Sequence, residues 1–340
     1  MAISFSPCPL FRYTSAMKRT TVLLQVCLFL VGTVVLNGLA CTSFAVYSGK
    51  TLYGMNFDYP PNEVRFSIEE HETGAVFIGS FWMGDHHGRT VGMNEHGLFA
   101  SDQMVFPLRA AVEEPAEDEV YVWNAFYSGL REGTSVDEVT AWIGERRLVQ
   151  YPTLPLHNLY ADADGGAMVV EAGEAGNVVT EIDGPFLVMT NFHNGDFQGA
   201  GLDEVHGDGA DRYRTAYTYI EEHLEAFNID HAFEVLRQTA QVAGDFKTRY
   251  SLVLDPEARE IYIALERDYD HIWKVSLAAR TIETFAGFDE EKTLALYGEG
   301  VAGPTLQSFA FERPNRGVIV SLLLLGGILA VVVAVLLSHV

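Results

Sequence analysis

Cys41 is the residue of this 340-residue chain with the clearest chemical potential. It directly follows the small-residue sequence Gly38-Leu39-Ala40, and the other two cysteines, Cys8 and Cys27, lie earlier in the chain. If the chain is cut after Ala40, Cys41 has no partner left for an intramolecular disulfide. A free thiol at a new amino terminus then needs a functional explanation.

The segment before Cys41 has the pattern of an export signal. Lys18-Arg19 is followed by an apolar run from Val22 to Leu36 and then by small residues, which is the order of a signal peptide with its cleavage site. The sixteen residues before Met17 read as an upstream extension. An uncleaved anchor is the alternative, but the apolar run is short for a bilayer core of ~30 Å. We therefore expect residues 1–40 to be removed as leader and signal peptide.

The other end of the chain predicts a membrane anchor over residues 317–338. The run from Gly317 to Leu337 is apolar and uncharged, and its twenty-one residues would reach about 31 Å as a helix, enough to span a bilayer. A buried core helix and a removed tail of a lipid-anchored protein are the alternatives. The expected arrangement is an exported catalytic domain, tethered to the cell membrane by its C-terminal helix.

A tight hairpin would bring a carboxylate to the cysteine. If Gly49-Lys50 are the central residues of a type II′ turn, Ser48 pairs with Thr51, and the same register places Cys41 opposite Asp58. Directly opposed residues of an antiparallel pair have Cβ atoms about 4.5 to 5.5 Å apart. We therefore expect the Asp58 carboxylate beside the thiol.

An amino-terminal cysteine combines a nucleophile and a base in one residue. A free α-amino group titrates at about 7.7 to 8.0, so part of it is unprotonated at neutral pH and can take the thiol proton. Asp58 would hold this amine in place. Such a thiol attacks acyl carbonyls, and the reaction then needs hydrogen-bond donors for the developing oxyanion.

The residues between the two apolar ends predict one domain over 41–310. Strand-like alternation occurs from Ser43 to Phe81 and again from Asn158 to Thr190, and the last strands, which end at Leu277, are expected to close the domain. Helices are expected over four ranges: Val120 to Leu130, Ser135 to Arg147, Asp211 to Glu225 and Asp230 to Gln241. Runs of strands separated from paired helices favour stacked antiparallel sheets over a doubly wound parallel fold.

Composition and motif spacing argue against several functional classes. A net charge of −24 argues against a protein that follows the phosphate backbone of nucleic acid. The chain lacks a glycine-rich phosphate loop of the usual spacing, so a nucleotide enzyme is not expected. His86-His87 with Asp85, and His193 with Asp196, lack a recognisable metal-ligand spacing. We expect solvated loops there and no metal.

Several short motifs, in their order along the chain, resemble the choloylglycine hydrolase type of N-terminal nucleophile hydrolase, which includes penicillin V acylases and related linear-amide hydrolases. The motifs are Cys41-Thr42, Gly54-x-Asn56-x-Asp58, Gly92-Met93-Asn94-Glu95-x-Gly97-Leu98 and Met189-Thr190-Asn191. The resemblance covers roughly Cys41 to Leu277. It implies an α+β fold of four layers, αββα, with two stacked antiparallel sheets between helical layers, and no metal or organic cofactor.

The resemblance also implies catalytic roles for four residues. Cys41 matches the nucleophile, and Asp58 matches the aspartate that holds its amine. Asn191 matches the side-chain donor of the oxyanion hole, and Arg212 resembles an arginine that lies near the cysteine. A turn residue at Asn191 and a solvated helix start at Arg212 are the plainer alternatives. A triad of Cys41 with His157 and the following asparagine is a further alternative, but it does not explain the processing site.

Met55 departs from the family pattern, which has an arginine at this position. Methionine supplies neither charge nor hydrogen-bond donors, so bile-salt or penicillin specificity is in doubt while the reaction type is not. We expect a more apolar substrate pocket at Met55, Phe81, Trp82, Met104 and Val105, with ordinary core packing as the alternative for the aromatic residues. The backbone at Met104 or Val105 would supply the second oxyanion donor.

The expected activity is hydrolysis of a linear carbon–nitrogen amide bond in a small-molecule N-acyl amide. Acyl transfer to another amine is the nearest alternative. A surface binding protein with a lipid on Cys41 is a second, although Gly38 stands where a leucine usually precedes a lipidated cysteine. The number of subunits stays open, a homo-oligomer included.

Overall fold

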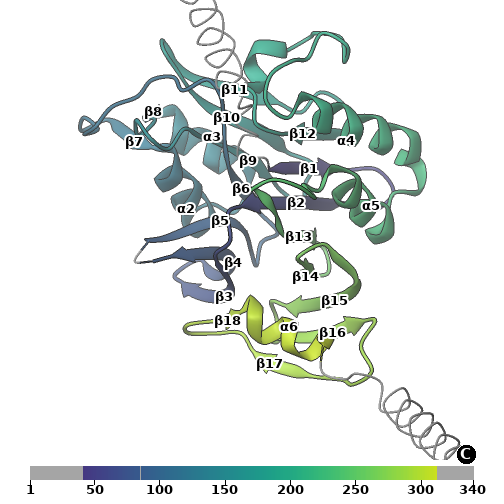
Figure 1. The fold of residues 1–340 in the computed structure, drawn as a ribbon. Coiled ribbons are helices and arrows are strands. Elements are labelled where there is room, and N and C mark those ends of the chain that lie inside the picture. The colour runs from purple at the N-terminus through teal and green to yellow at the C-terminus, as the bar shows by residue number, and fades with distance from the viewer. Residues whose placement is uncertain (1–40, 85, 312–340) are drawn as a thin grey trace, which may run out of the picture. The chain divides into compact units, whose positions relative to one another are not determined.

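The computed structural model of this chain describes residues 41–84 and 86–311 (Figure 1). The expected leader over 1–40 and the expected anchor over 317–338 lie outside these residues. None of the helices in the described part of the chain has the length and apolar character needed to cross a membrane.

Two antiparallel sheets, each of eight strands within the described residues, form the centre of the domain (Figure 1). The first has the order β12 (Phe186–Met189), β1 (Thr42–Val46), β2 (Leu52–Tyr59), β13 (Lys247–Asp255), β14 (Glu260–Leu265), β15 (Asp268–Ser276), β16 (Thr281–Ala286) and β17 (Thr293–Ala295). The second has the order β11 (Gly176–Glu181), β10 (Ala167–Gly173), β9 (Leu156–Ala161), β6 (Phe99–Met104), β5 (His86–Asn94), β4 (Gly74–Met83), β3 (Glu63–His71) and β18 (Val301–Ala302).

Helices cover the outer faces of both sheets. Helices α4 (Ala210–His223) and α5 (Ile229–Thr239) pack on the first sheet, and α2 (Val122–Glu132) and α3 (Val136–Gly144) pack on the second. The shorter elements are η1 (Asn194–Phe197), η2 (Leu224–Ala226), α6 (Gly303–Phe311) and a parallel pair of β7 (Glu119–Tyr121) with β8 (Arg147–Val149). The layers therefore follow the order αββα, as predicted.

Three of the four apolar clusters among the described residues join these layers. The largest lies between the two sheets and contains Tyr53, Phe77 and Trp273. The other two join each sheet to its helices, for example through Phe126 of α2 and Phe44 of β1. Because burial of a large apolar side chain contributes about 1.5 to 3 kcal/mol, the alternation of apolar residues along the strands is enough to fix which face points inward.

Side-chain caps mark the starts of helices α3 and α5. Ser135 is the N-cap of α3, and its hydroxyl accepts a hydrogen bond from the Glu138 backbone N–H at 3.3 Å. The Asn228 side chain caps α5 by accepting from the backbone N–H groups of Asp230 and His231. These bonds use backbone donors that the first turn of a helix leaves free.

The predicted hairpin register between β1 and β2 is wrong by one residue. Val46 pairs with Leu52 and Thr42 with Asn56, so residues 47–51 form a longer loop in place of a two-residue turn. Hydrogen bonds to distant segments hold this loop in place: the Tyr47 N–H donates to the Pro185 carbonyl at 2.8 Å. The Lys50 N–H also donates to a residue far away in the sequence, the backbone carbonyl of Phe227, at 3.2 Å. Long-range bonds have outweighed the local turn preference.

The prediction that the last strands of the domain end at Leu277 is also wrong. β16 and β17 extend the first sheet, and β18 extends the second. Ile282, Leu296 and Leu306 from this region are fully buried in the cluster between the sheets. The alternation in Thr281 to Ala286 was a readable strand signal.

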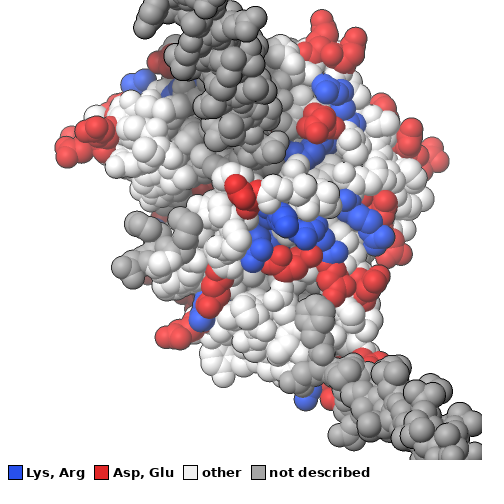
Figure 2. All heavy atoms as spheres, viewed as in Figure 1, with Lys and Arg blue, Asp and Glu red and all other residues white. Residues whose placement is uncertain are grey.

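Charged side chains are mixed on the face that Figure 2 shows, with acidic groups spread over it and basic groups lying beside acidic ones. Exposed ion pairs of the domain include Arg131 with Glu132 and Arg280 with Glu70. Exposed pairs of this kind contribute little stability, about 0 to 1 kcal/mol each. The apolar clusters therefore contribute much more to the stability of the fold than the surface ion pairs do.

Candidate active site

Cys41 lies immediately before β1, at the edge of the apolar cluster between the sheets. Its free thiol is buried, with 5% of the residue exposed. The backbone N–H of Asp58 points at the sulfur, with 3.5 Å between Asp58 N and Cys41 Sγ. The expected proximity of Cys41 and Asp58 is therefore present although the predicted register is not, because the end of β2 runs past the start of β1.

The Asp58 carboxyl group has one oxygen satisfied and one without a partner. Oδ1 accepts a hydrogen bond from the Thr248 hydroxyl at 2.5 Å. Oδ2 is buried and has no hydrogen-bond partner within the described residues. Burial raises the pKa of Asp58 to about 7, against the opposing effects of the Arg212 charge and the Thr248 hydroxyl. A hydrogen bond from an added N–H donor to Oδ2 would therefore stabilise the ionised carboxylate.

The Cys41 thiol does not ionise readily in this setting. Burial, followed by the nearby Asp58 charge, raises the thiol pKa to about 12, although the Asp58 backbone N–H and Arg212 act in the opposite direction. The sulfur therefore keeps its proton at neutral pH. Nucleophilic attack then requires a base that removes this proton during the reaction.

Arg212 connects the cysteine to Asn191. It lies in the first turn of α4 and is 6% exposed, so the alternative of a solvated helix-start residue is wrong. Its Nη1 donates to the Cys41 carbonyl and, at 3.1 Å, to the Thr42 hydroxyl. Its Nη2 donates to Asn191 Oδ1 at 2.8 Å. One guanidinium thus holds both the nucleophile's backbone and the predicted oxyanion donor.

Gly209 allows α4 to approach closely enough for these contacts. Its φ is +78°, and a Cβ atom there would lie 2.6 Å from Arg212 Nη2 and 3.0 Å from Thr190 Cβ. A side chain at this position would be strained and would also collide with the arginine. Gly209 therefore has a direct role in placing Arg212.

Asn191 is oriented by its contacts on both ends of the amide. Because Oδ1 accepts from Arg212, the NH₂ group must face the opposite side, where it donates to the Met104 carbonyl at 2.7 Å. An NH₂ group has two N–H bonds, so one remains available for an oxyanion. Asn191 is fully buried, which argues against an ordinary exposed turn residue.

The strand register distinguishes the two candidates for the second oxyanion donor. The Val105 N–H donates to the Pro155 carbonyl at 3.0 Å and is therefore occupied. Since backbone groups alternate along an antiparallel strand, Met104 directs its N–H and C=O away from β9. Its carbonyl meets Asn191 on that side, so the Met104 N–H faces the same region.

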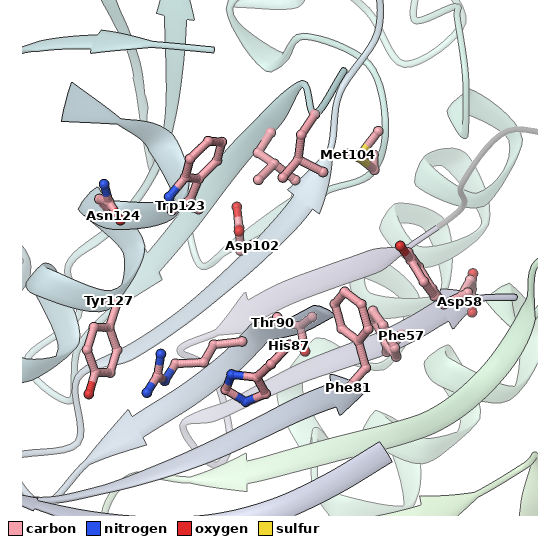
Figure 3. Close-up of a pocket in the computed structure, with 15 residues that line it drawn as sticks. Phe57, Asp58, Phe81, His87, Thr90, Asp102, Met104, Trp123, Asn124 and Tyr127 are labelled. Carbon is pink, nitrogen blue, oxygen red and sulfur yellow. The ribbon is translucent and has the colours of Figure 1, made fainter. Parts of the chain in front are cut away.

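A cavity of about 300 Å³ has Asp58 and Met104 in its lining (Figure 3), whereas Cys41, Asn191 and Arg212 lie behind these two residues and are not part of the lining. Its walls are mainly apolar and include Phe57, Phe81, Met104 and Trp123, with Asp58 at one end. Phe81 and Met104 are thus placed where the sequence predicted. The other three predicted pocket residues lie elsewhere: Met55 and Val105 are fully buried outside the lining, and Trp82 is 43% exposed beside a separate surface hollow.

Asp102 is a cavity residue that the sequence analysis missed. It follows a buried alanine and serine in β6, and its carboxyl accepts a hydrogen bond from the Asn158 side chain at 2.8 Å. Burial raises the pKa of Asp102 well above its usual range. Figure 3 shows the side chain within the cavity region, between Trp123 and Thr90. Ser101 and Gln103 flank it in the same strand, so the strand pattern did not single out Asp102.

The histidine alternatives are not supported by the contacts. Both nitrogens of the buried His157 have partners, Glu171 and the Thr190 carbonyl, so it does not form a triad with the cysteine. His193 is buried, so the expectation of a solvated loop there is wrong. Across residues 41–84 and 86–311, no group of three or more His, Cys, Asp or Glu side chains is arranged to hold a metal ion.

Comparison with known proteins gives a match in fold. No family model and no curated protein matches the chain significantly. Two solved variants of conjugated bile acid hydrolase from Clostridium perfringens resemble it with TM-scores of 0.59 and 0.57, each at 19% sequence identity. The matches cover 76% and 77% of this chain and 98% of each hydrolase chain. The chain therefore has the αββα fold of an N-terminal nucleophile hydrolase, as the resemblance predicted.

Proposed function

We propose that this chain is an amidohydrolase of the choloylglycine hydrolase type, which cleaves a linear carbon–nitrogen amide through an acyl-enzyme on Cys41. One observation carries the proposal: residues far apart in sequence meet around the buried thiol of Cys41, and one of them, Asp58, also lines an apolar cavity. Arg212 joins the Cys41 carbonyl to Asn191, and the Asp58 backbone lies against the sulfur. The fold supplies the framework, and these contacts supply the chemistry.

Removal of residues 1–40 would create the base that the thiol lacks. It turns the backbone nitrogen of Cys41 into an amine with a pKa of about 7.7 to 8.0, compared with about 12 for the buried thiol. The unpartnered Asp58 Oδ2 is an acceptor suited to one N–H of that amine. The opposite charge of a protonated amine would also lower the pKa of Asp58 and keep it ionised.

In the proposed reaction, the amine takes the thiol proton while sulfur attacks the substrate carbonyl carbon. The resulting oxyanion receives hydrogen bonds from the free N–H of Asn191 and from the Met104 backbone. The C–N bond then breaks, and the proton passes from the amine to the leaving nitrogen. Water attacks the thioester with the same amine as base, which releases a carboxylic acid and restores the thiol.

The cavity favours a substrate with an apolar acyl group. Its aromatic and aliphatic walls provide apolar surface close to Asp58, whereas Met55, at the position of the family arginine, is buried outside the lining. A volume of about 300 Å³ is at the small end of ligand pockets. We therefore propose a small-molecule N-acyl amide whose acyl group is apolar and compact.

The alternative of a lipid-carrying binding protein fits the geometry poorly. The Cys41 sulfur is packed against the Asp58 backbone between two sheets, where a lipid on sulfur would have to displace the core. Export through residues 1–40 and anchorage through residues 317–338 remain proposals. Amino-terminal sequencing and membrane fractionation of the native protein test them.

The function is tested by screening N-acyl amides that vary in acyl length against the wild-type protein, Cys41→Ser and Cys41→Ala. We expect the wild type to release acid and amine in equal amounts, and both variants to lose at least about 10³-fold in turnover, because the nucleophile is the core of the mechanism. Phe285→Ala, at an exposed position of β16 outside the cavity lining, serves as the control with unchanged turnover. Full activity of Cys41→Ala would remove the cysteine from the mechanism, and products formed only with an added amine would identify acyl transfer.

A further inference from the structure

A buried carboxylate lies between two imidazoles behind the candidate active site. Glu171 of β10 is buried, and its Oε1 lies 3.2 Å from the Nδ1 atoms of both His157 and His193. The same oxygen accepts from the Asn194 backbone N–H at 3.0 Å, and Oε2 accepts from the Gly195 N–H at 2.9 Å. A carboxylate with this many donors is fixed in position and charge.

The far nitrogens of both rings hold backbone carbonyls. His157 Nε2 lies 2.7 Å from the Thr190 oxygen, and His193 Nε2 lies 2.7 Å from the Pro107 oxygen. Because a carbonyl only accepts, each Nε2 must carry a proton.

The lowered pKa of Glu171 agrees with a carboxylate that is stabilised by its hydrogen-bond donors. Burial alone would raise the pKa of Glu171, but the hydrogen bonds from His157 and His193 outweigh it and lower the pKa to about 2. A charge-assisted network of this kind is stronger than neutral hydrogen bonds and holds one geometry.

This cluster fixes the segment that carries Asn191. On one side His157 holds the Thr190 carbonyl, and on the other Glu171 holds the Asn194 and Gly195 N–H groups. Asn191 lies between these points.

The same cluster reaches the second oxyanion donor. His193 holds the Pro107 carbonyl, three residues after Met104, and the Phe106 N–H donates to the Asn191 carbonyl at 2.8 Å. The two segments that carry the expected oxyanion donors are thus tied to one buried network.

We propose that Glu171, with His157 and His193, is a positioning cluster that sets the distance between the oxyanion donors of Asn191 and Met104. The inference rests on the proposed function. None of the three side chains is among the residues that line the described cavity, so the cluster acts on the rate of the chemical step through Asn191 and leaves substrate binding alone.

The first test compares Glu171→Gln with the wild type for kcat, KM and the rate of Cys41 alkylation by iodoacetamide. The glutamine keeps the shape of the side chain but removes the charge and faces its amide donors toward the imidazoles. We expect kcat to fall about 10- to 100-fold, somewhat less than the loss of an oxyanion donor itself, with KM and the alkylation rate within about twofold of wild type. Glu181→Gln, at an exposed position of β11, is the matched surface control and should leave all three unchanged. A Glu171→Gln variant with wild-type kcat, or with a loss confined to KM, would overturn the inference.

The second test asks whether Glu171 acts through Asn191. In a double-mutant cycle, the effect of Glu171→Gln is measured both in the wild type and in Asn191→Ala. If Glu171 acts through Asn191, the fold-loss of kcat caused by Glu171→Gln should be at least about fivefold smaller in the Asn191→Ala background, since the effects of two groups that act as a unit are not additive. If the wild type is active and the fold-loss from Glu171→Gln is the same in both backgrounds, the positioning role is wrong while the proposed function stands. A wild type that cleaves no N-acyl amide would overturn the proposed function and this inference with it. If Glu171→Gln does not fold, His193→Gln replaces it in the same cycle, because its amide retains a donor for the Pro107 carbonyl.

Discussion

Asp58 is the side chain that would connect the proposed removal of residues 1–40 to the proposed chemistry. Its Oδ2 atom is buried without a partner in the described part of the chain, and its pKa is raised to about 7 by burial. An unpaired buried carboxyl is unfavourable for the fold, so its presence beside Cys41 is better explained by a donor that arrives when the amino terminus is freed.

Replacing Asp58 should therefore separate activity from stability. We expect Asp58→Asn to lower kcat/KM by about 10²-fold or more, because the amine loses the group that holds it as a base. The melting temperature should stay equal or rise, since the amide retains an oxygen for Thr248 and has no charge to desolvate. Parallel thermal unfolding and initial-rate measurements check this, and unchanged turnover would exclude Asp58 from the mechanism.

The sequence predicted the residue-level site only in part. Cys41, Asp58, Asn191 and Arg212 follow from short motifs, and the structure brings them together. The roles of these residues stay predictions until the variants are measured. Asp102 was missed because the face of a strand on which a residue lies says nothing of the cavity in front of it.

At the scale of elements, α4 depends on a glycine for its approach to β12. Gly209 lies at φ +78° with Arg212 and Thr190 within 3.0 Å of where its Cβ would be. The helix itself was predicted from its periodicity within a residue or two at each end, but this contact distance was not, because it depends on how a helix docks on a sheet.

Gly209→Ala should displace Arg212 and with it Asn191. We expect kcat to fall by about 10-fold or more as the oxyanion donor shifts, together with a loss of about 1 kcal/mol or more in the free energy of unfolding from the strained φ. Gly199→Ala is the control, because Gly199 has a similar φ of +75° and open space around its Cβ. It should lose comparable stability and keep its kcat. Equal kcat values for the two variants would show that the Arg212 contact is not what matters.

Glu171 joins β10 to the segment after β12, and its charge should be visible as pH-dependent stability. Its pKa is about 2 in the folded protein and 4.5 ordinarily, so its contribution is present above pH about 4.5 and is lost as the pH falls toward 2. The shift corresponds to a contribution on the order of 3 kcal/mol. Urea unfolding of wild type and Glu171→Gln should show a difference of that order at pH 7 that shrinks steadily below pH 4.5; a difference independent of pH would contradict it.

The register error between β1 and β2 illustrates what local patterns leave open. A Gly-Lys pair suggested a two-residue turn, yet the loop is positioned by hydrogen bonds to Pro185 and Phe227, far away in sequence. Strand existence followed from alternation, whereas register depended on these distant partners. The His157–Glu171 contact is similar: the two residues are directly paired between β9 and β10, but nothing local pointed to His193 as the third member.

At the scale of the whole molecule, the C-terminal elements complete the core between the sheets. Ile282, Leu296 and Leu306 are fully buried there, although the motif resemblance ends near Leu277. The layered architecture was predictable from the order of strands and helices, but the strands after Leu277 were missed, because the family motifs surround the site and say nothing of distant sheet edges.

A chain shortened to end at Leu277 should therefore fail to fold cooperatively. Removal of three fully buried leucine or isoleucine side chains exposes apolar surface at about 1.5 to 3 kcal/mol for each, a large share of a typical domain's 5 to 15 kcal/mol. A chain ending at Phe311 is the control and should unfold in a single sharp transition by circular dichroism. A sharp transition in the shorter chain would show that the last elements are dispensable.

The central claim is that Cys41, as the first residue of the processed chain, carries the acyl group. The most direct measurement is peptide mass spectrometry of the enzyme quenched in acid during turnover of an N-acyl amide. We predict an amino-terminal peptide that begins at Cys41 and carries the mass of the acyl group on sulfur, lost on treatment with hydroxylamine. Sustained turnover by a chain that still contains Ala40, or an acyl group on any other residue, would contradict the mechanism.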